Sequence, residues 1–325
     1  MTIASASPPD RHANFGVHRV LAEDADPRFG RVRWSLAKSL WLTGMTTAAI
    51  AGGALTFSWE ALALFLVTCA ITLCGGHSLG MHRRLIHNSY DCPRWLEYVL
   101  VYLGVLVGMA GPYGMIRTHD LRDWAQRNPH CHDYFAHRRP LLQDGWWQLH
   151  CELTLARPPV VAFEDRIARD PVYRFMESTL MWQQLPWAVL FFALGGWGWV
   201  FWGVCARVAV CVTGHWLVGY FAHNSGHRDW HVEGAGVQGY NVRFCGLFTM
   251  GEAWHNNHHA FPGSARLGLY EGQADPGWWV LMALQRLGLA WNIKTPANLV
   301  PRPQLVALAN SAERGALAAS QAAAI

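Results

Sequence analysis

Long apolar segments constrain this chain of 325 residues more than any other feature of its sequence. Two of them, about 34–57 and 61–80, are each long enough to cross a bilayer, which takes roughly 20 helical residues. Two more, about 185–201 and 202–221, are joined by the sequence GGWGWVFWG. Hydrophobic residues make up 52% of the chain and charged residues 15%, which is too apolar for an ordinary soluble domain. We therefore expect an all-α integral membrane protein with two helical hairpins.

A further apolar stretch, about 95–115, is interrupted by glycines and by Pro112, as expected of either a span or a helix in the membrane interface. Arginine is concentrated between the second and third spans, on either side of stretch 95–115, whereas the hairpin tips carry only Glu60. Because positive residues stay on the cytoplasmic side, this central region should be cytoplasmic. If the histidine groups below share one site, stretch 95–115 cannot cross. Four transmembrane helices result, with both termini and a helical cap in the cytoplasm.

Three segments divide the chain. We expect residues 1–30 to form a flexible arm, 31–300 the membrane domain, and 301–325 an Ala-rich tail that is weakly helical or disordered. The start of the chain lacks the pattern of a secretory signal. A net charge of +4 without a dense basic run argues against a nucleic-acid partner. The eight cysteines include no CxxC pair, so we expect no disulfide framework.

The motif HNNHHAFP contains the most specific histidine pattern, with His255, His258 and His259 in the spacing HxxHH. On a helix these three positions share one face, which predicts that their imidazoles converge on one volume. First-row transition metals accept such nitrogen donors. The alternative is a hydrated, histidine-rich loop without a metal.

A second motif, HRRLIH, places His82 and His87 where the second span should emerge into the cytoplasm. Five residues exceed one helical turn, so these histidines suit one metal each, or share one metal through a local distortion of the helix. Since both motifs lie at cytoplasmic span ends, they are able to meet beneath the bilayer.

HRRLIH, the polar region that opens on His119, and GEAWHNNHHAFP together resemble the histidine boxes of membrane fatty-acid desaturases of the acyl-CoA and acyl-lipid type, over about 34–296. The resemblance implies two hydrophobic hairpins beneath a cytoplasmic cap that holds two iron ions. It also implies that the irons use O2 to introduce a double bond into a fatty acyl chain. The segment HWLVGYFAHNSGHR resembles the family's last-span segment, which implies that His223 is a ligand and His227 is not. Gly219 stands where the family has an asparagine that holds iron through a water, and His215 lies one turn earlier.

The second box departs from the family pattern HxxHH, because the sequence HDLRD keeps only His119. Arg122 cannot coordinate a metal, whereas Asp123 either binds one or forms a salt bridge with a neighbouring arginine. Replacement donors are available in His77, His130, His132 and His137, and less readily in His150. The expected metal ligands are His82, His87, His119, His223, His255, His258, His259 and Asp123.

Removing hydrogen from an unactivated methylene requires a redox metal and O2 rather than acid–base side chains. No haem-binding HPGG motif or cysteine-rich iron–sulfur run is present, so we expect a separate electron donor such as ferredoxin or cytochrome b5, docked on the arginine-rich face. The substrate would be an acyl chain linked to CoA, a carrier protein or a membrane lipid.

Three alternatives remain at this point. A hydroxylase, epoxygenase or ketolase uses similar boxes, and the altered HDLRD box is also compatible with an inactive homologue. A metal transporter or membrane electron carrier is the alternative from another class. Such a carrier would place its ligands at mid-membrane depth, whereas the histidine boxes lie at the ends of the apolar segments.

Overall fold

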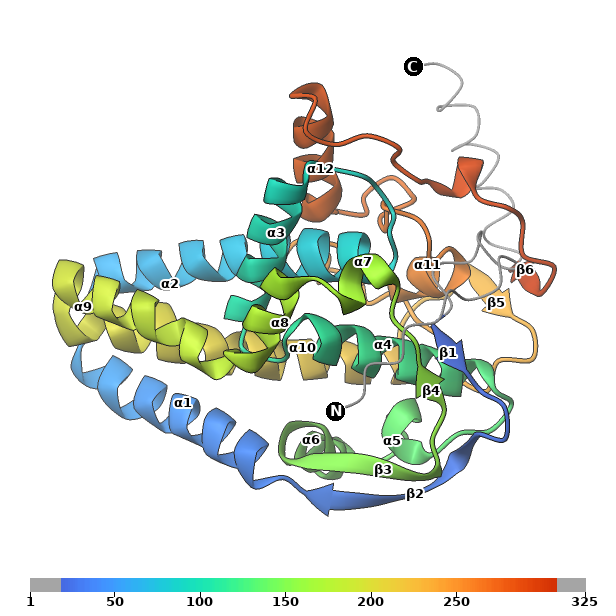
Figure 1. Cartoon of the computed structure of the whole chain (residues 1–325), viewed down its shortest axis with the longest axis horizontal. Helices are drawn as coiled ribbons and strands as arrows, with labels where there is room; N and C mark the ends of the chain where they lie inside the picture. Colours follow the sequence, from blue (N-terminus) through green and yellow to red (C-terminus); the bar gives the residue numbers. More distant parts are fainter. Residues whose placement is uncertain (1–18, 309–325) are drawn as a thin grey trace.

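The computed structural model describes residues 19–308, so the parts of the predicted arm and tail at 1–18 and 309–325 lie outside the described residues. An elongated lobe of helices forms one side of the molecule, and shorter helices and loops gather into a cap around α11 (His255–Ala260) on the other side (Figure 1). The lobe consists of α1 (Leu36–Leu55), α2 (Trp59–Ile71), α9 (Gln184–Val200), and α10 (Arg207–Asn224) with the π-helix η3 (Phe201–Ala206) before it.

Two helices among the described residues are long and apolar enough to cross a membrane, Trp59–Ile86 and Met181–Asn224. The first joins α2 to the π-helix η1 (Thr72–Ile86). The second has 44 residues and breaks at Gly195 and Gly196, where Gly196 takes a φ of 66°. Because a left-handed backbone suits glycine, the chain is able to turn back there. The predicted boundary between the last two spans thus lies a few residues too late.

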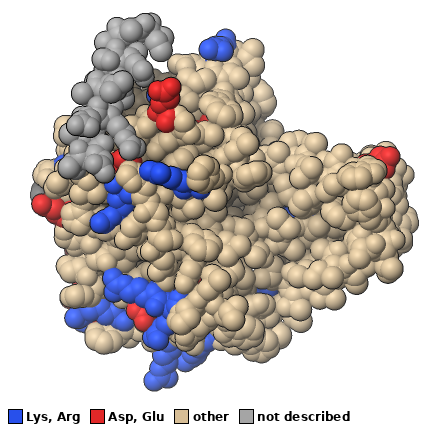
Figure 2. All heavy atoms as spheres, turned by 180° about the vertical axis from the view of Figure 1, so that it is seen from behind, with Lys and Arg blue, Asp and Glu red and all other residues tan. Residues whose placement is uncertain are grey.

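The surface of the lobe is apolar and exposed. Leu55, Trp59 and Val189 are 87%, 75% and 68% exposed. Figure 2 shows that the lobe is almost free of Lys, Arg, Asp and Glu, whereas these residues gather on the cap. An exposed apolar surface of this extent is typical of a region covered by lipid.

The apolar stretch 95–115 forms no single span. It divides into α3 (Arg94–Leu106) and the start of α4 (Pro112–Arg127), separated by a turn in which Gly108 has a φ of 87°. α3 runs across η1 rather than along it (Figure 1). Gly76 of η1 allows this crossing, because a Cβ at this position would lie 2.3 Å from the backbone of Leu103.

The remaining helices are short and build the cap. They are α5 (Asp133–Ala136), α6 (Leu141–His150), α7 (Asp165–Ala168), α8 (Pro171–Ser178), α12 (Pro276–Arg286) and η4 (Pro296–Asn298). The turn η2 (Met181–Gln183) begins the long helix Met181–Asn224.

Three small antiparallel pairs of strands correct the all-α prediction in detail. The pairs are β1 (Val20–Leu21) with β4 (Val160–Val161), β2 (Asp26–Trp34) with β3 (Cys151–Arg157), and β5 (Trp230–Val232) with β6 (Leu305–Ala307). The first strands begin inside the predicted arm, and Arg19 is fully buried in ion pairs with Asp120 and Glu164. The folded region therefore extends beyond both predicted boundaries, because these segments pair with distant parts of the chain.

The π-helix η1 is buried on several sides, which fixes the direction of its side chains. Met81 and Leu85 belong to a core cluster formed with α3, α4 and α8. Arg83 bonds Asp275 at 2.7 Å, and both side chains are buried. Breaking such a buried pair leaves an uncompensated charge, which costs roughly 3–5 kcal/mol. These contacts hold the end of the span against the cap.

Candidate metal centre

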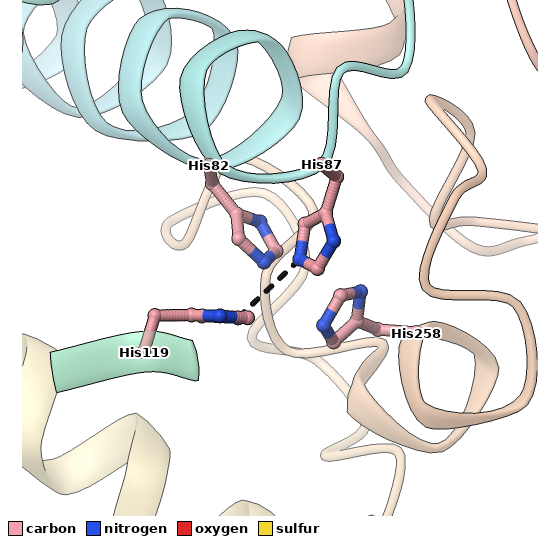
Figure 3. A group of neighbouring side chains, drawn as sticks. All are labelled: His82, His87, His119 and His258. Atoms are coloured by element: carbon pink, nitrogen blue, oxygen red, sulfur yellow. Dashed lines mark hydrogen bonds between the residues drawn. The ribbon is translucent and has the colours of Figure 1, made fainter. Parts of the chain in front are cut away.

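Four histidines from three separate segments form the first group. His82 and His87 come from the end of η1, His119 from α4 and His258 from α11, and their rings point into one space (Figure 3). Each histidine offers one ring nitrogen, and these four nitrogens all lie within 4.8 Å of one another. The Nε2 atoms of His87 and His119 are 3.3 Å apart.

The π-helix explains why His82 and His87 belong to the same group. In a π-helix, hydrogen bonds join residues five apart, so a spacing of HxxxxH returns to the same face. An α-helix advances by 100° per residue and would turn the two side chains well apart. The structure therefore has the local helix distortion that would let His82 and His87 share one metal, which was one of the two alternatives for HRRLIH.

Carboxylates behind the first group orient its rings. The Nδ1 of His82 lies 2.7 Å from Oε2 of Glu252, and the Nδ1 of His119 lies 3.2 Å from Oδ1 of Asp120. Glu252 also accepts a hydrogen bond from Ser78 at 2.7 Å. The hydrogen bond to Asp120 holds the proton of His119 on Nδ1 and leaves its Nε2 free to bind a metal, while Glu252 places a carboxylate beside His82. Neither carboxylate was among the predicted functional residues, although Glu252 lies only three residues before His255.

His223, His255 and His259 form the second group. The Nε2 of His255 lies 3.1 Å from that of His223 and 3.0 Å from that of His259. The Nδ1 of His223 donates to the carbonyl oxygen of Gly219 at 2.7 Å, so its Nε2 carries a lone pair. α10 and α11 thus supply three imidazole nitrogens directed at a common point.

The histidines of HNNHH do not all converge on one volume, which corrects that prediction. α11 directs His255 and His259 to the second group, and His258 to the first. Neighbouring positions on a helix differ by about 100°, so His258 and His259 face different ways. The helix itself is present as predicted, and it links the two groups.

The donor set fits two transition-metal ions. Burial lowers the pKa of His87, His255 and His258 well below 6.5, and neighbouring histidines lower it further. Burial also lowers the pKa of His259 to about 4. These four imidazoles are therefore neutral at pH 7, as metal ligands must be. Within each group, Nε2 atoms of neighbouring rings lie 3.0 to 3.3 Å apart. A bound cation would accept the lone pairs that these nitrogens direct at one another.

The altered second box lies beside the second group. Asp123 forms an ion pair with Arg127 at 2.5 Å and is not among the grouped ligands, although its charge acts on His259. Arg122 donates to His137 and to Gln148. The Arg127 pair is one of the alternatives that the sequence allowed for Asp123.

His137 fills the space that Gly219 leaves open. Its ring stacks on that of His223 with a centroid distance of 5.3 Å, and a Cβ at position 219 would lie 3.5 Å from its Nε2. The Nδ1 of His137 lies 2.8 Å from Asp144, which also accepts from Trp216 at 2.8 Å. A buried network thus occupies the side of the second group where the resemblance implies an asparagine and a histidine in place of Gly219 and Arg122.

The other candidate histidines lie outside both groups. His130 is exposed, His132 caps α5, His150 lies 3.1 Å from the hydroxyl of Ser39, and His227 contacts Asp229. His77 and His215 contact each other.

Comparisons with known proteins agree with this geometry. A family model described as fatty acid desaturase matches residues 57–269. The sn-1 stearoyl-lipid 9-desaturase of Anabaena variabilis is 36% identical, over 73% of this chain and 85% of that protein. The acyl-CoA C20 Delta5-desaturase of Anemone leveillei is 30% identical, over 76% of this chain and 78% of that protein. For the Delta-9 acyl-lipid desaturase 1 of Arabidopsis thaliana the identity is 32%, over 74% and 78%. The chain belongs to the fatty acid desaturase family.

Proposed function

We propose that this protein is a membrane-bound desaturase that introduces a double bond into a fatty acyl chain with O2 as co-substrate. The observation that carries the proposal is the pair of separate histidine groups joined by α11. Relatives named for stearoyl-lipid and palmitoyl-lipid 9-desaturation favour an acyl chain linked to a membrane lipid over one linked to CoA.

The first group would hold one iron through His82, His87, His119 and His258. The second would hold another through His223, His255 and His259, with Asp123 as its fourth ligand after release from Arg127. When bound, the two irons supply the oxidising chemistry that removes hydrogen from a methylene. The protein orients the ligand rings through Glu252 and Asp120.

The proposed topology has four spans. α1 and α2 with η1 form one hairpin, and the two halves of Met181–Asn224 on either side of Gly196 form the other. The histidine groups and both termini would lie on the cytoplasmic side, where the arginines gather. Six exposed arginines on this cap offer a surface for an acidic electron donor such as a ferredoxin or cytochrome b5 (Figure 2). They are Arg28, Arg31, Arg33, Arg138, Arg139 and Arg157.

Lipid profiling of cells that express the protein tests this function. We expect a new monounsaturated acyl chain in the membrane lipids, and its absence in cells that express the His258→Ala variant at the same level. Separating lipid classes before the chains are released shows whether the double bond arises on a lipid or on CoA. Unchanged acyl chains in cells whose protein is loaded with iron would contradict the proposal.

A further inference from the structure

His77 and His215 form a pair of imidazoles that belongs to neither histidine group. The edge of one ring faces the other, with centroids 4.8 Å apart and an interplanar angle of 78°. His77 lies on η1, five residues before His82, and the two rings are parallel at 6.3 Å. The pair therefore sits directly on the membrane side of the first group.

One polar atom of this pair is buried without a partner. His77 is 92% buried, and its Nδ1 has no hydrogen-bond partner among residues 19–308. Leaving such an atom unpaired costs roughly 1–3 kcal/mol. Gly76 and Gly80 press against the backbone of α3, since a Cβ at either position would lie within 2.4 Å of it. This packing prevents η1 from withdrawing His77 from the site.

The pair is open on the side of His215. His215 is exposed on α10, and a Cβ at the neighbouring Gly214 would meet no atom within 4 Å. An acyl chain that reaches the first group from between the spans would pass here. A plain hydrocarbon cannot use an imidazole, whereas a neutral imidazole is able to donate to, or accept from, an oxygen.

We propose that His77 and His215 bind an oxygen substituent, a hydroxyl or a carbonyl, on the acyl chain a few carbons from the position of dehydrogenation. The proposal deepens the proposed function and rests on it, because the pair acts on the substrate of the adjacent metal centre. The substrate class is then a hydroxyacyl or oxoacyl chain rather than an unsubstituted one. A site built to bond an oxygen discriminates against a chain that lacks it.

Competition feeding tests this specificity. Cells that express the full-length protein receive octadecanoic acid together with one monohydroxy or mono-oxo positional isomer at a time, and the dehydrogenated fraction of each is measured by mass spectrometry. We expect the wild type to favour at least one oxygenated isomer, and the preference to fall roughly tenfold in His77→Leu and in His215→Leu. His77→Gln, which keeps a donor and an acceptor, should restore part of the preference, and the exposed control His130→Leu should not change it.

Metal content and apparent melting temperature of the purified variants establish that they fold. The inference would be overturned if the ratio of the dehydrogenated fractions of oxygenated isomer and octadecanoic acid were the same in wild type and both leucine variants for every isomer. Water alone would then occupy the pair. In that case, double bonds in octadecanoic acid would leave the desaturase function standing. No double bond in any chain, with the protein loaded with iron, would overturn both.

Discussion

The backbone N–H of His87 donates to the carbonyl oxygen of His82, five residues earlier, at 3.1 Å. This hydrogen bond closes the last turn of the π-helix η1, which runs from Thr72 to Ile86. The π-helix places His82 and His87 on one face, beside His119 and His258, whereas an α-helix would point them in different directions. The first metal site therefore depends on backbone geometry as much as on the identity of its ligands.

Replacing His87 with alanine should remove the first metal and abolish desaturation, because three imidazoles remain where four converge. Removing a group that hydrogen-bonds to a ligand typically costs about 10–100-fold in metal affinity, and loss of the ligand itself should cost at least as much. Lipid profiling and metal analysis of the purified protein check this. His130→Ala, which removes an exposed histidine outside both groups, should retain metal and activity. Wild-type activity in the His87 variant would rule out the assignment.

Asp123→Asn should weaken the second metal if the carboxylate is its fourth ligand. Asp165 offers a matched control, since it pairs with Arg169 at the same i,i+4 spacing, at 3.5 Å. Dialysis against a graded chelator followed by metal analysis distinguishes the two. We expect Asp123→Asn to lose one metal at a chelator concentration roughly tenfold lower than either Asp165→Asn or wild type. Identical loss in all three proteins would show that Asp123 serves only its pair with Arg127.

Gly80→Ala should destabilise the protein, because the added Cβ would lie 2.4 Å from the backbone of Leu100. Overpacking of this kind costs roughly 1–3 kcal/mol. At Gly44 of α1 a Cβ would meet nothing within 4 Å, so Gly44→Ala should stabilise the helix slightly. Apparent melting temperatures in detergent should fall for the first variant and stay level or rise for the second. A fall of the same size in both would refute the close approach of η1 and α3.

The metal-free protein should lose stability as the pH falls. Burial lowers the pKa of His137 and of His259 to about 4, whereas an unfolded histidine titrates near about 6.5. Below about 6.5 the unfolded chain therefore binds protons that the folded chain does not, and the free energy of unfolding decreases down to about pH 4. Melting of chelator-treated protein between pH 7.5 and 5 measures this. The melting temperature of the His259→Gln variant should depend less steeply on pH. A wild-type melting temperature that does not change with pH would contradict the lowered pKa values.

Local patterns in the sequence were sufficient to predict the apolar segments, the helix of HNNHH and the histidines of HNNHH and HRRLIH as metal ligands. The choice of His119 and His223 depended on the resemblance to the desaturase family. They were insufficient for the π-helix, since an apolar sequence before HRRLIH suits either helix and tertiary packing decides between them. The division of α11 between two groups, and the contact of Arg122 with His137, depend on where distant segments meet. The pairing of β2 with β3 likewise joins residues more than a hundred positions apart.

The iron content of the purified protein, measured together with that of His87→Ala and His259→Ala, shows whether the two histidine groups bind separate metals. Two separate groups predict two irons per chain in the wild type and one in each variant, because each substitution damages one group alone. The His130→Ala control should retain two. A wild type that holds one iron or only zinc, or a single substitution that removes both metals, would contradict the assignment of two independent metal sites.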